Sequence, residues 1–459
     1  MNTQLIPLLR AGAPLALASL AQTLVGTLAL MVAGRVGERE LGAVGLGSSL
    51  FFTIAAFGVG LLLGVDPIVS GAAGRGDREG VRRAVGQGLL LAFAAALVLA
   101  GVIALAAVML GPGLLAVDTR IDLQRYIWGR LPGLAPYLAF VVLRSAAAAR
   151  ARTGRVLLAS ALASICVLLT APALASELGV LGVGLAESGG ALVQVLVLAR
   201  GAPRPSFTRA RSGLVAVVSS GLPVGLALVA EYAVFASLGW LVARIDPGHL
   251  GAHQVAMAWL GTLFMLPVGL GAGVAAAVGR ALGRADALSA RDSARAGAWA
   301  ALALGIMLGA PLVLVPEALA AWVTREPAVV AAAPVLMRIA GFVLVADSVQ
   351  VVAVGASRGA GATRFALGAC LSGHYLLGLP LGVMLATHAG LGAAGLWLGL
   401  GVGLSAIAGL LGWRNRRTGE LEPSPCPSRS RESSSPALWT APLCSPLPPA
   451  LPASPRPLP

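Results

Sequence analysis

Long apolar runs, separated by short polar segments, dominate the pattern of this 459-residue chain. Runs of about 20 apolar residues recur twelve times between about residue 12 and Trp413, and each is long enough to cross a ~30 Å hydrocarbon core as a helix. The runs lack the two-residue alternation of membrane barrel strands. The pattern therefore predicts an all-α integral membrane protein with twelve transmembrane helices.

The two halves of the chain match each other at a spacing of 209 residues. The matched positions include Pro14 with Pro223, Arg35 with Arg244, Gly74-Arg75 with Gly283-Arg284, and Asp77 with Asp286. An even number of spans in each repeat returns the second copy to the same membrane face. We therefore expect two parallel six-helix bundles related by a pseudo-two-fold axis along the membrane normal, with lobes at 1–200 and 214–413 and a linker at 201–213.

Arginine is concentrated in alternate loops, which changes how the net charge of +14 is interpreted. A nucleic-acid binder would carry its cations on one soluble surface, so that partner is not expected. The positive-inside rule instead places both termini in the cytoplasm of a multi-pass protein of the inner or plasma membrane, in contact with lipid. The basic loops hold Arg75, Arg78, Arg82 and Arg83; Arg150, Arg152 and Arg155; Arg200, Arg204, Arg209 and Arg211; Arg280, Arg284, Arg291 and Arg295; Arg358 and Arg364; and Arg414, Arg416 and Arg417.

The ends of the chain and its potential metal ligands add little to this architecture. The first residues run into the first span without a cleavage pattern, so no removable signal peptide is predicted. The Pro/Ser-rich segment 414–459 is expected to be a disordered cytoplasmic tail. The four cysteines and four histidines show no metal-ligand spacing. No cofactor and no metal site is expected, apart from a possible Na+ at the acids described next.

Two carboxylates lie in the middle of spans in the second half. Glu231 interrupts the apolar segment Gly221 to Arg244, and Asp347 lies within the tenth span. An ionisable group at such depth is costly and marks a functional site. The repeat places Gln22 and Ala139 at the corresponding positions of the first half, which indicates a specialised site in the second half. Both acids are predicted to bind the coupling H+ or Na+.

Other polar groups within the spans are weaker candidates. Glu187 is central to the sixth span and is a possible first-lobe proton site, or else it pairs with a neighbouring helix. Asp66 precedes Pro67, which removes a helix hydrogen bond and is expected to free a carbonyl near Leu63. For Asp66, an interfacial or helix-kink role is therefore expected at least as much as a functional one. Gln22, Gln254 and Gln350 are the remaining secondary candidates.

Several segments resemble the multidrug and toxic compound extrusion (MATE) exporters of the NorM type, over about Leu5 to Trp413. They are GLPVGLALVAEYAVFA, the stretch Gly251 to Gly283, ADSVQVVAVGASRGAG and LLGLPLGVML in the second half, and PLALASLAQTLVG, MVAGRVG and LGAVGLG in the first. The resemblance implies twelve helices in two lobes. It also implies efflux of amphipathic, often cationic compounds in exchange for Na+ or H+.

The resemblance also assigns residues. Glu231 matches the family's glutamate of the seventh helix and Asp347 its aspartate of the tenth, both associated with cation coupling. In the first lobe, Ala29 stands where NorM-type proteins carry an aspartate, and Thr170 stands where they carry an asparagine. A first-lobe site would therefore need another carboxylate, and Glu187 is the one available.

The chain itself favours secondary transport over an enzymatic or ATP-driven activity. All 33 basic side chains are arginine, so no P-loop lysine exists in this sequence. The alternatives are a flippase for lipid-linked saccharides, which would hold basic residues in its cavity, and a degenerate exporter that no longer transports. Arg144 and Arg338 are the basic exceptions within spans, and Arg130 is expected near the outer face. The expected partners are organic cations and lipid, and the protein is expected to be a monomer.

Overall fold

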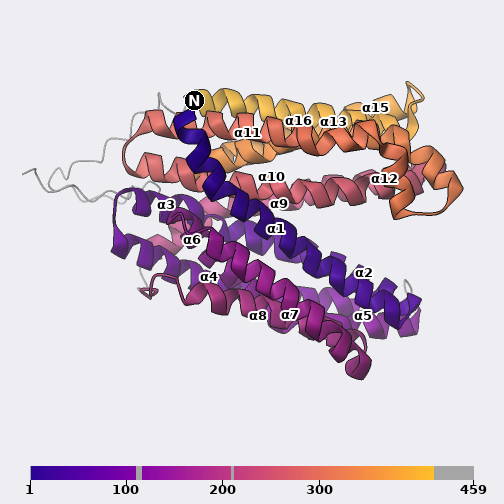
Figure 1. Ribbon diagram of the computed structural model, residues 1–459, viewed down its shortest axis with the longest axis horizontal. Coiled ribbons are helices and arrows are strands. Elements are labelled where there is room, and N and C mark those ends of the chain that lie inside the picture. The colour runs from indigo at the N-terminus through magenta and orange to yellow at the C-terminus, as the bar shows by residue number, and fades with distance from the viewer. Residues whose placement is uncertain (1, 110–115, 208–210, 418–459) are drawn as a thin grey trace, which may run out of the picture.

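The computed structural model describes residues 2–109, 116–207 and 211–417, and these residues form helices joined by short turns. Twelve helical segments are long and apolar enough to cross a membrane. This confirms the predicted all-α class and the predicted number of spans. Figure 1 shows two groups of helices, built from the first half of the chain and from the second.

The first group contains six spans, two of which are interrupted. The second span is α2 followed by α3, and the fourth is α5, a 3₁₀ turn η1 and α6. The bounds are α1 Asn2–Val36, α2 Glu38–Leu62, α3 Val65–Gly74, α4 Arg78–Met109, α5 Val117–Arg130, η1 Leu131–Gly133, α6 Leu134–Ala149, α7 Gly154–Leu178 and α8 Val180–Ala199.

The second group also contains six spans, and it adds a short helix, α12, between its third and fourth spans. Its fifth span contains a π-helical turn, η3. The bounds are α9 Arg211–Ile245, η2 Pro247–His249, α10 Leu250–Gly283, α11 Ala287–Leu314, α12 Pro316–Val323, α13 Pro327–Gly359, α14 Thr363–Leu371, η3 Ser372–Gly378, α15 Leu379–Thr387 and α16 Gly392–Arg417.

The interruptions coincide with residues that weaken helical hydrogen bonding. The second span breaks between Leu62 and Val65, immediately before Asp66 and Pro67, as expected from a proline that lacks a donor. In the fourth span, Pro132 lies within the 3₁₀ turn that joins α5 to α6. The helix is therefore interrupted where the proline predicts it, but the Leu63 carbonyl, which was expected to be free, accepts a hydrogen bond from the N–H of Asp66 at 3.1 Å.

The two groups contact each other in pairs that obey the pseudo-two-fold axis. A Cβ at Gly60 on α2 would overlap the backbone of Gly225 on α9, and a Cβ at Gly269 on α10 would overlap the backbone of Ala16 on α1. These contacts are related by the 209-residue spacing, because Gly60 corresponds to Gly269 and Ala16 to Gly225. The first helix of each lobe thus crosses the second helix of the other, and the parallel repeat is present in three dimensions.

The lobes also meet at the membrane end that carries the arginine-rich loops. There, Gly71 and Gly74 at the end of α3 pack directly on Gly283 and on the backbone of Arg280 at the end of α10. In Figure 1 the two groups lie closest near α3, α6 and α10, and they diverge toward the opposite end, which bears α5 and α12. The arginine-rich end is therefore closed by contact between the lobes.

The expected bounds of the second lobe change at both ends, and its first helix already begins at Arg211, within the expected linker. The last helix continues to Arg417 instead of ending near Trp413. Asn415 is buried, accepts a hydrogen bond from Ser357 at 3.0 Å and donates one to the carbonyl of Ala353 at 3.1 Å. Its side chain anchors the last turn to α13, so 414–417 belong to the lobe. The remainder of the expected tail, 418–459, lies outside the described residues.

Asp246, in the turn after α9, ties that turn to the start of α16. Its carboxylate accepts hydrogen bonds from the N–H of Ala393 at 2.9 Å and from His249 at 2.7 Å. Burial opposes ionisation, but these two hydrogen bonds outweigh it and lower the pKa of Asp246. A lowered pKa contributes stability that is present above the ordinary carboxyl pKa and is lost as the pH falls through the folded value.

We expect Asp246→Asn to destabilise the purified protein by about 1 kcal/mol at pH 7, because the charge-assisted hydrogen bonds are weakened in a partly exposed site. Thermal unfolding should show a lower Tm than the wild type at neutral pH, and a difference that shrinks as the pH is lowered below about 4. A Tm difference that is constant with pH would contradict this role of the ionised form.

Candidate functional site

The two predicted acids of the second lobe lie on different helices, α9 and α13. Asp347 is 1% exposed and its Oδ1 makes no hydrogen bond within the described structure, while Glu231 is half-buried with an unpaired, buried Oε1. The two carboxylates are close enough for the charge of Glu231 to act on Asp347. Neither forms an ion pair with a basic side chain of the described residues. The structure therefore brings the two acids together without a counter-charge.

Further polar groups lie on the helices around this pair. Gln350 is 1% exposed, its amide nitrogen lies 3.9 Å from the sulfur of Cys370, and its Oε1 is unpaired. Tyr375 on η3 donates to the carbonyl of Ala230, next to Glu231, at 2.8 Å. His374 is buried, and neither ring nitrogen has a partner among the described groups. π turns occur frequently at functional sites.

Two of the secondary candidates lie elsewhere. Gln254 on α10 has an exposed side chain, and Gln22 on α1 is half-buried in the first lobe. The neighbour of Gln254, His253, is instead the buried residue, and it accepts a hydrogen bond from Trp397 at 3.2 Å. Within the described residues, neither Gln22 nor Gln254 hydrogen-bonds the buried, unpaired oxygens of Glu231 and Asp347.

Glu187 occupies a separate site in the first lobe. It is 1% exposed, accepts a hydrogen bond from the Tyr126 hydroxyl at 2.6 Å, and lies 3.4 Å from Nε of Arg130. The tyrosine hydroxyl is in turn 2.8 Å from that of Ser48 on α2. The partners of Glu187 thus come from the fourth span, and Ser48 of the second span is linked to it through Tyr126. Ala29 is fully buried, and the Thr170 hydroxyl donates to the carbonyl of Cys166.

Small residues allow α5, which carries Tyr126 and Arg130, to pack closely against α8, which carries Glu187. A Cβ at Gly129 would meet the backbone of Gly184, and the Ser188 hydroxyl donates to the carbonyl of Gly129 at 2.8 Å. Arg130 follows directly and is only 4% exposed. Its guanidinium is buried against Phe51 and Glu187. The position of Arg130 near the outer face of the membrane stays a prediction.

Asp66 forms an ion pair between the lobes. Its Oδ2 lies 2.9 Å from Nε of Arg358 at the end of α13, and both side chains are about nine-tenths buried. Arg144 on α6 lies close enough to act electrostatically on both groups. Nearby, Arg280 donates to the carbonyl of Ala148 at 2.7 Å. These contacts join the lobes at the arginine-rich end.

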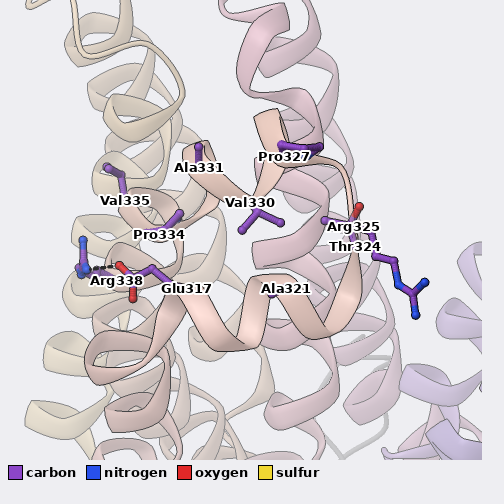
Figure 2. A pocket seen from close by; sticks show the side chains of 10 residues that line it. All are labelled: Glu317, Ala321, Thr324, Arg325, Pro327, Val330, Ala331, Pro334, Val335 and Arg338. Atoms are coloured by element: carbon purple, nitrogen blue, oxygen red, sulfur yellow. Dashed lines mark hydrogen bonds and ion pairs between the residues drawn. The ribbon is translucent and has the colours of Figure 1, made fainter.

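A pocket of about 740 Å³ lies between α12 and the first turns of α13 (Figure 2). Its one ion pair joins Glu317 to Arg338 at 2.6 Å, and both side chains are about half exposed. Arg338 lies within the span Pro327–Gly359, as expected, and its side chain is at the rim of this pocket. Asp347 lies nine residues further along α13, about 13 Å at 1.5 Å per residue. The pocket is thus distinct from the paired acids.

Comparison with known proteins identifies the class of protein that this fold and these acids define. The family model described as MatE matches residues 14–173 and 223–384, one segment in each lobe. The chain belongs to the MatE family.

Its similarities to individual proteins extend over most of its length. It is 32% identical to the probable multidrug resistance protein NorM of Deinococcus radiodurans, over 89% of this chain and 94% of that one. It is 29% identical to the multidrug resistance protein NorM of Vibrio vulnificus, over 90% and 96%. The crystal structure of the eukaryotic MATE transporter AtDTX14 superposes with a TM-score of 0.83 at 19% identity, over 91% of this chain and 98% of that one.

Proposed function

We propose that this protein is a secondary active exporter of amphipathic, cationic compounds, and not an enzyme. One observation carries the proposal: Glu231 and Asp347 are brought together inside a MatE fold without a basic partner among the described residues. Buried carboxylates of this kind must be neutralised from outside. Export by antiport with H+ or Na+ uses this requirement, because the cation and the cargo compete for the same negative charge.

The lobes supply the conformational change. Contacts at the arginine-rich end, which we place in the cytoplasm, close one side of the molecule. When a cation neutralises Glu231 and Asp347, the balance between the two lobe arrangements changes, since a ligand shifts an equilibrium by its difference in affinity for the two states. The related proteins named multidrug resistance proteins support this assignment of cargo. We propose a monomer in the inner or plasma membrane with both termini cytoplasmic.

The buried arginines favour an exporter over a flippase for lipid-linked saccharides. A flippase needs unpaired cations in its cavity to hold a pyrophosphate. Here the buried guanidiniums of Arg130 and Arg358 face Glu187 and Asp66. Arg144 lies near Asp66, which already pairs with Arg358. Glu231 and Asp347 lie together without a basic partner among the described residues, and two such acids suit a cationic cargo.

Dye accumulation tests the proposal directly. Cells expressing the protein should accumulate less of a cationic dye such as ethidium than vector controls. An uncoupler or the removal of Na+ at fixed pH should abolish the difference and thereby identify the coupling ion. Equal accumulation with and without the protein, across several cationic dyes, would favour the flippase function instead.

A further inference from the structure

The first lobe contains a buried carboxylate that already has a cation. The carboxylate of Glu187 is fully buried and the guanidinium of Arg130 lies 3.4 Å from it, at 5% side-chain exposure. Among the described residues, Arg130 and Tyr126 are the titratable side chains that act electrostatically on Glu187. An arginine stays protonated in proteins, so this positive charge is permanent.

Aromatic residues hold the guanidinium in place. It lies 4.6 Å from the ring centre of Phe51 and 5.7 Å from that of Phe52, both on α2. Such stacking stabilises a desolvated cation and restricts its movement. Because Arg130 also belongs to α5, the cation is part of the lobe and moves with it when the lobes rearrange.

The second lobe presents the opposite arrangement. Glu231 and Asp347 place two acids together, and no basic side chain of the described residues neutralises them. The charge of Glu187 is therefore neutralised within its own lobe, while the acid pair of the second lobe depends on an external cation. In the first lobe, Ala29 and Thr170 offer no ionisable side chain to change this balance.

We propose that Arg130 is a tethered counter-cation that takes the place, in the first lobe, of a transported H+ or Na+. Glu187 then neither binds nor releases the coupling ion, and the number of ions exchanged is set by Glu231 and Asp347 alone. The consequence for the number of ions exchanged rests on the proposed function. The pairing itself is testable without transport.

A double-mutant cycle on the detergent-purified protein tests the pairing. Glu187→Gln leaves a buried guanidinium without a counter-charge, and Arg130→Gln leaves the carboxylate without one. Each single variant should lower the Tm by at least about 5 °C, and the Glu187→Gln/Arg130→Gln double variant should recover most of that loss. Glu177→Gln, at an exposed position of α7, is the matched control and should leave the Tm unchanged.

The pH dependence of the same variants separates a tethered cation from a proton site. In Arg130→Gln, Glu187 must take up H+ or Na+ to remain buried, so the Tm in Na+-free buffer should fall with rising pH more steeply than in the wild type. The double variant should lose this added dependence. Equal pH dependence in Arg130→Gln and the double variant, or a double variant as unstable as the single ones, would overturn the proposal.

Transport supplies the second readout. In the double variant, whatever its absolute rate, dye efflux should still collapse with an uncoupler or on Na+ removal, as in the wild type. A folded double variant whose residual efflux no longer responds to the ion gradient would show that Glu187 carries the ion. Absence of efflux by the wild-type protein would instead refute the proposed function, while leaving the Tm cycle valid for the pairing.

Discussion

Glu231→Gln and Asp347→Asn are each expected to reduce coupled dye efflux to the level of vector controls. Both changes keep the size of the side chain and remove its ability to become charged. Without that charge, binding of H+ or Na+ no longer differs between the two arrangements of the lobes, so an ion gradient cannot drive the change. The measurement is the initial rate of efflux of ethidium from preloaded cells.

Folding should survive these two substitutions. Neither carboxylate pairs with a basic side chain of the described residues, so no buried cation is left behind. The matched control is Glu317→Gln, which makes the same chemical change at an exposed ion pair on α12 and should leave efflux intact. Full efflux by either variant would refute that residue's role, and loss of the folded protein would point to a structural role instead.

Arg358→Gln is expected to open the arginine-rich end of the molecule. Its ion pair with Asp66 joins the lobes and is about nine-tenths buried. Breaking a buried pair by removing one partner costs about 3 kcal/mol or more, which corresponds to a shift of about 100-fold between two lobe arrangements. Asp347 lies eleven residues before Arg358 on the same helix, so α13 links the acid pair to this contact.

Spin-label distances measure the shift. Labels at Arg83→Cys on α4 and Asp292→Cys on α11, with the native cysteines replaced, report the separation of the lobes at that end. The Arg358→Gln variant should populate a longer label-to-label distance that is only a minor component of the wild-type distribution. The charge exchange Asp66→Arg/Arg358→Asp should restore the short distance. Identical distance distributions for the wild type and Arg358→Gln would mean that the pair does not hold the lobes together.

The architecture was largely predictable because it follows from local chemistry. Lipid requires continuous apolar helices, and the 209-residue repeat fixes their parallel order. The same spacing relates Gly60 on α2 to Gly269 on α10, and both glycines prove to be the points where the lobes cross. The break before Pro67 was likewise predictable, because proline removes a specific hydrogen bond.

The partners of the buried charges were less predictable. Glu231 and Asp347 stand out individually, since each interrupts an apolar run. The pairing of Glu187 with Arg130 instead depends on how closely α5 approaches α8, and the distance between these residues along the chain does not reveal it. The glycines at 129 and 184 are the signal in the sequence that permits this approach. The pairing of Asp66 with Arg358 depends on the relative position of the lobes, which no local pattern specifies.

Ion movement in proteoliposomes tests the central claim most directly. Purified protein would be reconstituted into vesicles, an outward gradient of ethidium imposed, and the internal pH or Na+ followed with a trapped indicator. We expect the wild type to move H+ or Na+ in the direction opposite to the dye, and the Glu231→Gln/Asp347→Asn double variant to move neither. Dye-driven ion movement that persists in the double variant would contradict the account.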